Sequence, residues 1–373
     1  MTTPRIAVIG VGSIGAQVLW QLARRGIEVT GFETFAPGHD RGAAGGDTRI
    51  FRSAHFEDSR WVPILARADV LWDDLSEATG RELRRLIGCV LTGPSDDGQM
   101  HTVLQSIADH GLDHEPMDHH ELSRRFPAFR GRAGDTAIID ARAGFVRPEL
   151  TILLTAQLAE QAGARLVRNT RVLDIAEHGD AVLVTTDAGV ETFDRVVVTA
   201  GPWCNEVVGT VTGGEVTVRR PISAWYALKD PATPLPTFIR TGPRHFYAVP
   251  SPDGLSMKLG LSVTDHLVLD DPDRVPREVT AAELEPFGEV INDYIPGVHT
   301  DPIRVATYLE GYTPDSRPIV HSGTDGRGIT VLAGFSGHGF KLAPAFGQVG
   351  ADLVLTGRTD VPIEFLGRDP IGV

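Results

Sequence analysis

The apolar residues near the start of the chain follow two patterns in succession. The run Ile6-Ala7-Val8-Ile9 is continuous, which is typical of a strand buried on both faces of a parallel sheet. The next apolar residues recur at the helical period until Gly26, a residue that favours a helix C-terminus. These helical positions are Val18, Leu19, Leu22 and Ala23. Together with a second apolar stretch at 27–32, they predict a strand–helix–strand unit over residues 5–33.

The same patterns recur along the rest of the chain. Helices are predicted at 58–80 and 149–163, and strands at 165–174, 181–186 and 191–200. Residues 81–144 mix short elements with turns, and residues 217–310 are rich in strands. A last strand and helix, over 329–356, close the chain.

Two glycine-rich turns follow strands at opposite ends of the sequence. The first is Gly10-Val11-Gly12-Ser13-Ile14-Gly15, and the second is Gly334-Phe335-Ser336-Gly337-His338-Gly339-Phe340-Lys341. In the first, glycines allow a tight turn, close approach of the backbone to a pyrophosphate, and packing of helix on strand. The helix N-terminus offers its N–H groups and partial positive charge to the phosphates. A nicotinamide enzyme usually needs only the first turn, so two turns indicate a large two-ended cofactor, and FAD is the candidate.

An acidic residue supports dinucleotide binding. Glu33 ends the second strand, 18 residues after Gly15, near the spacing of an acid that binds a ribose hydroxyl. A carboxylate repels a 2′-phosphate, so NADP is disfavoured. Glu33 does not separate NAD from FAD, and a purely structural glycine turn is the alternative.

These segments predict a mixed α/β (α+β) fold. We expect a Rossmann-like FAD-binding domain interleaved with a β-sheet substrate-binding domain. The FAD-binding domain is predicted at 1–80, 145–215 and 325–373, and the substrate-binding domain at 81–144 and 216–324.

Composition narrows the partners and the compartment. The 373 residues are 42% hydrophobic and 23% charged, typical of globular proteins, and the formal net charge of −14 argues against nucleic acid. Only two cysteines are present, Cys89 and Cys204, so neither a disulfide framework nor a structural zinc site is expected. Neither a signal peptide nor an apolar run long enough to span a membrane is seen. We therefore expect a cytoplasmic protein, a monomer or small homo-oligomer, that does not bind membranes.

A group of histidines raises the question of a metal site. These are His101, His110, His114, His119 and His120, of which 110 and 114 have the spacing of one helical turn. They match no known pattern of metal ligands, so we predict an exposed helix face and no metal.

Four segments together resemble one enzyme family. Gly46-Asp47-Thr48-Arg49-Ile50-Phe51-Arg52, Ala200-Gly201-Pro202-Trp203, Met257-Lys258-Leu259-Gly260 and Gly334 to Lys341 occur in order with fitting spacing. They resemble segments of the monomeric sarcosine oxidase and N-methyltryptophan oxidase family, within the wider D-amino-acid-oxidase-type flavoproteins. The resemblance runs from residue 6 to about residue 350.

The resemblance implies a chemistry and a set of roles. Flavin takes a hydride from the carbon next to an amine nitrogen, the resulting imine hydrolyses, and O2 reoxidises the flavin to give H2O2. Arg52 and Lys341 match residues that bind the substrate carboxylate, and Tyr247 matches a tyrosine of the substrate pocket. Lys258 matches a lysine that promotes the reaction with O2, and Arg49 matches a residue beside the flavin. The alternatives are a surface ion pair for Arg52 and a solvated strand-end position for Lys258.

The predicted cofactor contacts combine the glycine turns with the matched segments. They are Gly10, Gly12, Ser13, Ile14, Gly15, Glu33, Thr48, Arg49, Val172, Ala200, Gly201, Trp203, Gly337, His338, Gly339, Phe340 and Lys341. We interpret His338 as part of the second turn rather than as a catalytic base.

The chain departs from the family at three positions. Tyr308 stands 33 residues before Lys341, where monomeric sarcosine oxidases attach flavin through a cysteine, so we predict non-covalent FAD. Glu310 replaces an aromatic substrate contact, and Ser262 replaces an active-site histidine. An acid beside an apolar N-methyl group is costly, so we predict a substrate other than sarcosine that is larger or more polar. The alternative is that Glu310 pairs with a neighbouring arginine.

The sequence therefore predicts an FAD-dependent oxidase of an amino acid or N-substituted amino acid, with the small-molecule amine and O2 as its partners. A flavin-dependent amine dehydrogenase or a biosynthetic tailoring oxidoreductase of the same fold is the alternative. A non-catalytic flavoprotein and an NAD dehydrogenase are further alternatives, and the second glycine turn disfavours the latter.

Overall fold

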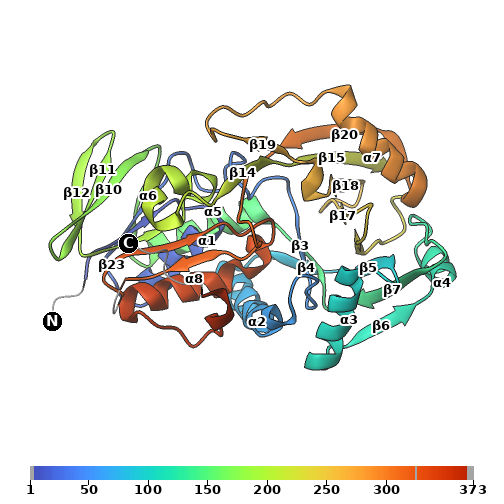
Figure 1. Ribbon diagram of the computed structural model, residues 1–373, viewed down its shortest axis with the longest axis horizontal. Helices are drawn as coiled ribbons and strands as arrows, with labels where there is room; N and C mark the ends of the chain where they lie inside the picture. The colour runs from blue at the N-terminus through green and yellow to red at the C-terminus, as the bar shows by residue number, and fades with distance from the viewer. Residues whose placement is uncertain (1–3, 324–325, 368–373) are drawn as a thin grey trace.

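The computed structural model describes residues 4–323 and 326–367, and it is organised around two large sheets. Figure 1 shows a long molecule with the first sheet and its helices on one side and the second sheet on the other. The chain passes between the two sides several times. The fold is mixed α/β, as predicted.

The first sheet has six strands in the order β22-β23-β13-β1-β2-β9. Its strands are β1 (Ile6–Ile9), β2 (Val29–Phe32), β9 (Arg165–Val167), β13 (Arg195–Val198), β22 (Ile319–His321) and β23 (Gly328–Ala333). All pairs are parallel except β22 with β23. Ile6 and Val8 pack into one apolar core, and Ala7 and Ile9 into another, so β1 is buried on both faces as predicted.

Helices cover one face of this sheet. They are α1 (Ser13–Ala23), α2 (Val62–Thr79), α5 (Pro148–Gln161) and α8 (Gly339–Thr356). Helix α1 contacts both α5 and α8, and α2 contacts α8. The other face carries α6 (Cys204–Thr212) and an antiparallel sheet of β10 (Val172–His178), β11 (Ala181–Thr186) and β12 (Gly189–Phe193).

The second sheet has eight strands in the order β20-β15-β18-β17-β16-β5-β7-β6. Its strands are β5 (Cys89–Pro94), β6 (His114–Met117), β7 (Asp135–Asp140), β15 (Ile222–Leu228), β16 (Thr237–Arg240), β17 (Phe246–Pro250), β18 (Ser256–Leu261) and β20 (Val298–Thr307). The outer helices here are α3 (Gly98–His110), α4 (His119–Arg125) and α7 (Ala281–Tyr294).

Two small sheets complete the described part of the chain. One contains β3 (Arg49–Phe51), β4 (Arg84–Leu86) and β8 (Gly144–Val146), and the other contains β14 (Thr217–Arg220), β19 (Leu267–Leu269) and β21 (Glu310–Tyr312). Short 3-10 helices lie at Ser59–Trp61, Gly201–Trp203, Val263–Asp265 and Glu364–Leu366.

Some predicted elements have different bounds. The predicted strand 165–174 is two strands in different sheets, because Asn169 adopts a left-handed φ of 53° between β9 and β10. The predicted strand 191–200 is likewise divided between the hairpin strand β12 and the parallel strand β13. Predicted helix 58–80 is a 3-10 turn followed by α2.

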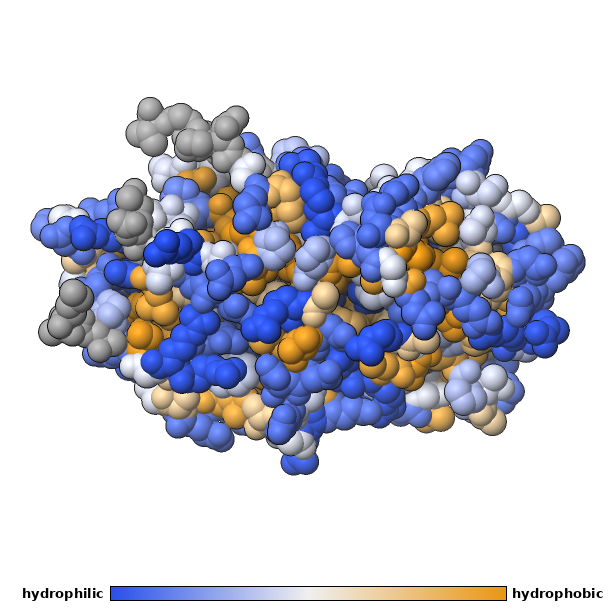
Figure 2. All heavy atoms as spheres, turned by 90° about the horizontal axis from the view of Figure 1, so that it is seen from below, coloured by the Kyte–Doolittle hydropathy of each residue, from blue (hydrophilic) through white to orange (hydrophobic). Residues whose placement is uncertain are grey.

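The predicted domain boundaries stay a prediction. Their first and last segments include residues 1–3, 325 and 368–373, which lie outside the described residues. Within the described residues, no helix is both long and apolar enough to cross a bilayer. Figure 2 shows mainly hydrophilic side chains on one face, with apolar groups scattered among them.

Candidate active site

The first glycine turn lies at the wall of a deep cleft beside the six-stranded sheet. This cleft has a volume of about 390 Å³ and is lined by residues from β1, α1, β2 and the 172 and 200 regions. Gly10 has a φ of +86°, and a β-carbon there would lie 2.8 Å from the carbonyl oxygen of Thr199. A β-carbon on Gly15 would lie 1.9 Å from the carbonyl oxygen of Gly10. Both positions therefore require glycine for the turn to pack against the strands.

The first turn of α1 is open to an anion. Gly12 is its N-cap and offers no side chain to cap the helix, and the first turn carries no acidic residue. Its free N–H groups and helix dipole favour a phosphate at this end of the cleft.

Glu33 is buried in the wall of the same cleft. Its carboxylate accepts hydrogen bonds of 2.9 Å from the backbone N–H groups of Val11 and Phe35. It thereby ties β2 to the glycine turn while remaining part of the cleft wall. This position suits an acid that binds a sugar hydroxyl.

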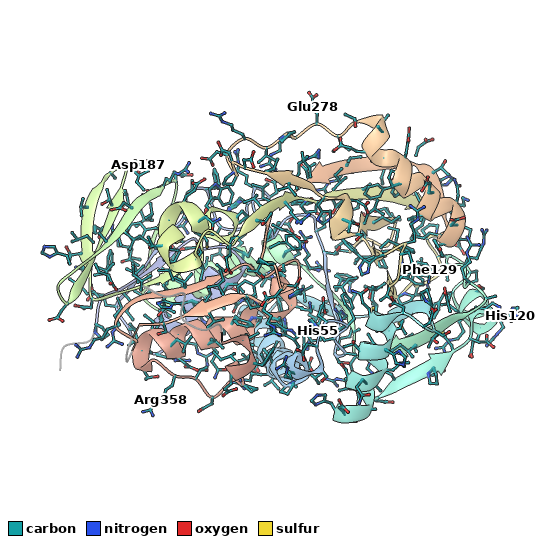
Figure 3. The ribbon with its side chains drawn as sticks, in the orientation of Figure 1. His55, His120, Phe129, Asp187, Glu278 and Arg358 are labelled. Carbon is teal, nitrogen blue, oxygen red and sulfur yellow. The ribbon has the colours of Figure 1, made fainter. Side chains whose placement is uncertain are left out.

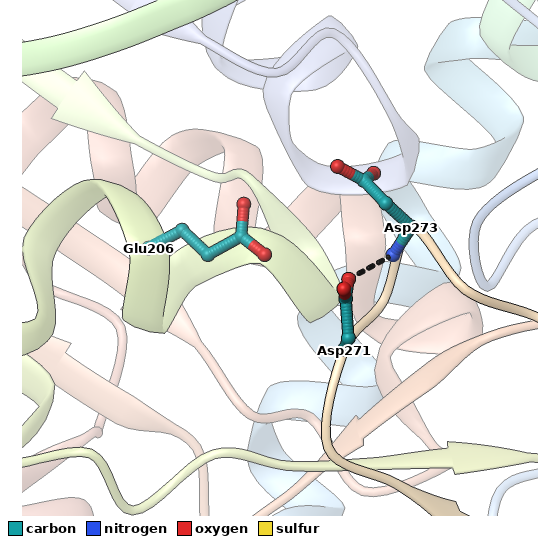
Figure 4. A group of neighbouring side chains, drawn as sticks. All are labelled: Glu206, Asp271 and Asp273. Carbon is teal, nitrogen blue, oxygen red and sulfur yellow. Dashed lines mark hydrogen bonds between the residues drawn. The ribbon is translucent and has the colours of Figure 1, made fainter.

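Three acidic side chains gather at the mouth of the cleft. Figure 4 shows Glu206, Asp271 and Asp273 close together, and the backbone N–H of Asp273 donates to Asp271 at 2.8 Å. Arg171 forms ion pairs with Glu206 at 2.8 Å and with Asp273 at 2.6 Å, and Trp203 donates to Asp273 at 2.9 Å. Asp271 also pairs with Arg274 at 3.2 Å, so each of the three carboxylates has a partner and we do not assign a metal site here.

A second cavity, of about 380 Å³, lies between α8 and the second sheet. Arg49 connects the two cavities, because it lines the second one and its guanidinium donates a 2.9 Å hydrogen bond to the carbonyl of Ala43, which lines the first. The two cavities are therefore neighbours, separated at this point by the Arg49 side chain.

Two basic side chains meet in the second cavity from opposite ends of the sequence. Arg52 follows β3, Lys341 lies in the first turn of α8, and both are buried in the cavity wall. The Arg52 guanidinium donates to the carbonyl of Ala54, and Lys341 Nζ donates to the carbonyl of His338 at 3.3 Å. Burial, followed by the charge of Arg52, lowers the pKa of Lys341 to about 7. The pair forms the basic pole of the cavity, and Arg52 is not the surface ion pair considered as an alternative.

An acidic side chain that the sequence reasoning missed accompanies this pole. Glu57 approaches His55 at 2.5 Å, and Arg52 and His338 at 3.5 Å each. Burial alone would raise the pKa of Glu57, but His55, His338 and Arg52 hold it well below its usual value. Figure 3 shows His55 near the centre of the molecule. In the sequence, the only sign that Glu57 belongs to the site is that it lies close to the matched segment that ends at Arg52.

His338 is the N-cap residue of α8, where its side chain makes no capping hydrogen bond, and its ring is neutral at physiological pH. Its Nε2 lies 3.0 Å from the carbonyl oxygen of Ser316, and burial lowers the pKa of its ring to about 4. His338 therefore lies at the end of the second turn, directly before α8, and its interpretation as a turn residue rather than a base stays a prediction.

The wall of the cavity also carries a carboxylate. Glu310 and Tyr312 lie on β21, and the Tyr312 hydroxyl donates to Glu310 at 2.7 Å. Burial, followed by the charge of Glu310, raises the pKa of Tyr312 well above its usual value, so Tyr312 remains a donor. Tyr312 was not predicted as a site residue. It stands two residues after Glu310, and residues two apart lie on the same face of a strand.

Lys258 lies in the middle of β18 and is completely buried. Its Nζ donates to the carbonyl of Gly46 at 3.0 Å and also to that of Thr48. Burial, followed by the charge of Arg49, lowers the pKa of Lys258 well below its usual value. The alternative of a solvated lysine at a strand end is therefore wrong.

The residue at the family's attachment position is not activated as a nucleophile, because burial raises the pKa of the Tyr308 hydroxyl to about 12. Tyr308 is buried against Gly45 and Gly46, where a β-carbon at Gly46 would lie 2.8 Å from its hydroxyl. Cys89 and Cys204 are both buried in the cores, and burial raises the pKa of each to about 12. Neither thiol is prepared to attack a flavin, because the thiolate is the reactive form.

The structure brings most of the predicted residues into these two cavities. Gly10, Gly12, Ser13, Glu33, Val172, Ala200, Gly201 and Trp203 line the first cavity, and Arg49, Arg52, Tyr247, Glu310, Gly337, His338, Phe340 and Lys341 line the second. Ile14, Gly15, Thr48, Lys258 and Gly339 line neither cavity but lie directly behind their walls in the glycine turns, in the loop before β3 and in β18. Ser262 lines the second cavity, and His245 and His266, which were not predicted, line it as well.

The histidine group is not one exposed helix face. Helix α3 ends at His110, and His114 lies on β6 with its ring buried 3.5 Å from Asp140. The predicted helical turn between them is therefore wrong, because Gly111 ends α3 with a left-handed φ of 59°. His120 lies at the outer edge of the molecule (Figure 3).

Comparisons with known proteins agree with this arrangement. The family model described as FAD dependent oxidoreductase matches residues 5–353. Monomeric sarcosine oxidase of Streptomyces avermitilis is 31% identical over 96% of this chain and 95% of its own length. N-methyl-L-tryptophan oxidase of Yersinia pestis is 28% identical, with 93% of each chain covered. The solved structure of NikD, described as an unusual amino acid oxidase essential for nikkomycin biosynthesis, superposes with a TM-score of 0.87 at 24% identity, covering 100% of this chain and 99% of that one.

The matched residues span both large sheets and both glycine turns. The named relatives cover nearly the whole chain, so the similarity is not confined to the nucleotide-binding unit. This chain belongs to the family of FAD-dependent oxidoreductases.

Proposed function

We propose that this enzyme oxidises an amino acid or N-substituted amino acid at the carbon next to its nitrogen, and that O2 is the final electron acceptor. The observation that carries the proposal is the pair of buried cations, Arg52 and Lys341, in a cavity next to the proposed cofactor cleft. The planar guanidinium offers a carboxylate two parallel hydrogen bonds, and the ammonium adds a point charge. The sarcosine and N-methyltryptophan oxidases named above act on such amines.

The residues present fit FAD. The uncapped first turn of α1 and the cradle at Gly10 suit its pyrophosphate, and Glu33 suits the ribose. The start of α8 also has neither a side-chain cap nor an acidic residue in its first turn, which suits the electron-rich end of the ring. Bound FAD would supply the two-electron acceptor for the amine and pass the electrons to O2.

The protein itself positions and selects the substrate. Arg52 and Lys341 hold the carboxylate, which fixes the position of the reacting carbon. Oxidation by hydride transfer requires a neutral amine and needs no base on His338, whose pKa of about 4 leaves it uncharged. We propose that Arg49 stabilises negative charge beside the cofactor and that Lys258 stabilises charge developing on O2.

The test separates an oxidase from a dehydrogenase. Purified enzyme is supplied with amino acids under air, and the formation of H2O2 and the consumption of the amine are measured. An artificial dye is added as the competing electron acceptor. We expect equal amounts of H2O2 and oxidised amine. Dye reduction without H2O2 would instead favour the dehydrogenase.

We predict that FAD is held without a covalent bond, because Tyr308 and the two buried thiols provide no attachment point. Acid precipitation should leave the flavin in the supernatant, where its absorbance and fluorescence measure it. Flavin that remains with the washed precipitate would contradict the prediction.

We also predict that the affinity for carboxylates falls as pH rises. Lys341, with a pKa of about 7, is cationic below this pH and neutral above it, so it attracts an anion only on the acidic side. The Kd of acetate, measured by perturbation of the flavin spectrum, should rise between pH 6 and pH 9, by at most about tenfold per unit. Lys341→Met should flatten the profile, and a flat profile in the unsubstituted enzyme would count against this role.

The two cysteines bear on the cellular setting. Two buried, unpaired cysteines suit a reducing compartment, so we propose a cytoplasmic enzyme. We further propose that it acts as a monomer or small homo-oligomer and that its substrate is not sarcosine.

A further inference from the structure

The second cavity has an acidic pole as well as a basic one. Glu310 lines its wall from β21, and Tyr312 donates to one carboxylate oxygen, Oε2. Because the pKa of Tyr312 is raised, this hydroxyl keeps its proton and Glu310 remains a hydrogen-bond acceptor. A ligand in the cavity therefore meets an anionic acceptor as well as the cations proposed to bind its carboxylate.

The charged and titratable residues around Glu310 do not remove its role as a hydrogen-bond acceptor. Arg219 lies across from Glu310 in the β14–β21 ladder, and its guanidinium lies 5.6 Å from the Tyr312 ring centre. His266 lies 6.2 Å from Tyr312, and burial lowers the pKa of His266, which keeps it neutral. Arg49 also lines the cavity. Tyr247 faces the same space with a raised pKa, caused first by burial.

The two poles are close together because they touch neighbouring residues of one turn. A β-carbon at Gly337 would lie 3.4 Å from Glu310 Oε2 and 3.0 Å from the Tyr312 hydroxyl. Lys341 Nζ donates to the carbonyl of His338, the next residue, at 3.3 Å. A short molecule is therefore long enough to reach from one pole to the other.

We infer that the substrate is a short diamino acid, whose carboxylate binds Arg52 and Lys341 and whose second, protonated nitrogen binds Glu310. The inference rests on the proposed function and names its substrate class. A carboxylate facing a cavity is best satisfied by a cationic donor, because charge-assisted hydrogen bonds are the strong ones. An apolar substituent at this wall would leave Glu310 desolvated and without that partner.

Matched ligands test the inference. Each enantiomer of 2,4-diaminobutyrate is compared with 2-aminobutyrate, which has the same chain without the second nitrogen. We expect the diamino acid to reduce the flavin of the holoenzyme anaerobically with about 10- to 100-fold higher efficiency. Glu310→Gln, which keeps the shape of the side chain, should remove this preference by lowering the efficiency of the diamino acid far more than that of 2-aminobutyrate.

Two control variants isolate the carboxylate. Glu278→Gln makes the same charge change at an exposed position (Figure 3) and should keep the preference. Tyr312→Phe removes the hydroxyl donor but keeps the acid, so a preference should persist. Equal efficiency of the two ligands in the unsubstituted enzyme, or equal loss for both in Glu310→Gln, would overturn the inference.

The design separates this inference from the proposed function. If neither ligand nor any other amino acid reduces the flavin, the proposed function is wrong. The inference is then decided by calorimetric binding of the two ligands to the holoenzyme and to Glu310→Gln. Tighter binding of the diamino acid that depends on Glu310 would support it, and equal binding would overturn it.

Discussion

Replacing Arg52 by Gln should reduce kcat/KM for the amino-acid substrate by about 30-fold to several thousand-fold. Removing one partner from a buried, hydrogen-bonded charge pair costs about 2–5 kcal/mol, and each 1.4 kcal/mol is about a factor of ten. Arg52 is buried in the cavity wall, so little water is available to replace its contacts with a carboxylate. The loss should be larger in Arg52→Gln/Lys341→Met, which removes the whole basic pole.

The decrease in kcat/KM should occur only with substrates that carry a carboxylate. An amine that lacks this group should react equally slowly with the variants and with the unsubstituted enzyme, because it never uses the basic pole. Arg60→Gln serves as a control, since Arg60 is exposed and pairs with Asp58 at 2.5 Å. Flavin content and thermal melting of each variant show whether the fold is retained, because Glu57 loses a partner in Arg52→Gln. Unchanged kcat/KM in the double variant would refute the assignment.

Lys258→Met should slow the reaction of reduced enzyme with O2 by about 100- to 1000-fold, the usual effect of removing one group that stabilises developing charge. Reduction by substrate should change by less than about tenfold, because Lys258 does not line the substrate cavity. Stopped-flow measurement of the two half-reactions separates the effects. Equal slowing of both would contradict a role toward O2.

The charge of Lys258 must be distinguished from its hydrogen bonds. Its Nζ binds the carbonyls of Gly46 and Thr48, so Lys258→Met also leaves these acceptors unsatisfied. Lys258→Gln keeps a donor but has no charge, and it should be as slow with O2 as Lys258→Met. Because burial and Arg49 lower the pKa of Lys258, the O2 reaction of the unsubstituted enzyme should slow as pH rises through that pKa.

Local patterns were sufficient to predict the nucleotide-binding unit. Burial on both faces requires apolar residues throughout the run from Ile6 to Ile9. Close backbone contact requires glycine in the turn from Gly10 to Gly15. Both requirements are visible directly in the sequence. The break at Asn169 was missed because a single left-handed residue leaves little trace between two apolar stretches. The strand position of His114 was missed for a related reason, since the spacing of 110 and 114 fits a helix but Gly111 ends it.

The cavity was only partly predictable, because its residues come from distant elements. Arg52 and Lys341 were identified through resemblance to a family, whereas their burial in one cavity depends on the packing of α8 beside β3. Glu57 has no periodic or motif signal, and its contacts arise only when His55 and His338 are brought together. The burial of Lys258 likewise requires the loop at Gly46 to lie over the second sheet.

Anaerobic reduction of the flavin tests the central claim most directly. The holoenzyme is mixed without O2 with primary, N-methylated and cyclic amino acids, and with the corresponding amines that lack the carboxylate, while the visible flavin absorbance is followed. We predict that at least one amino acid bleaches the flavin and that its decarboxylated counterpart bleaches it at least about 30-fold less efficiently, in line with the loss of a buried charge contact. Equal bleaching by both members of the pair, or no bleaching by any amino acid, would contradict the account.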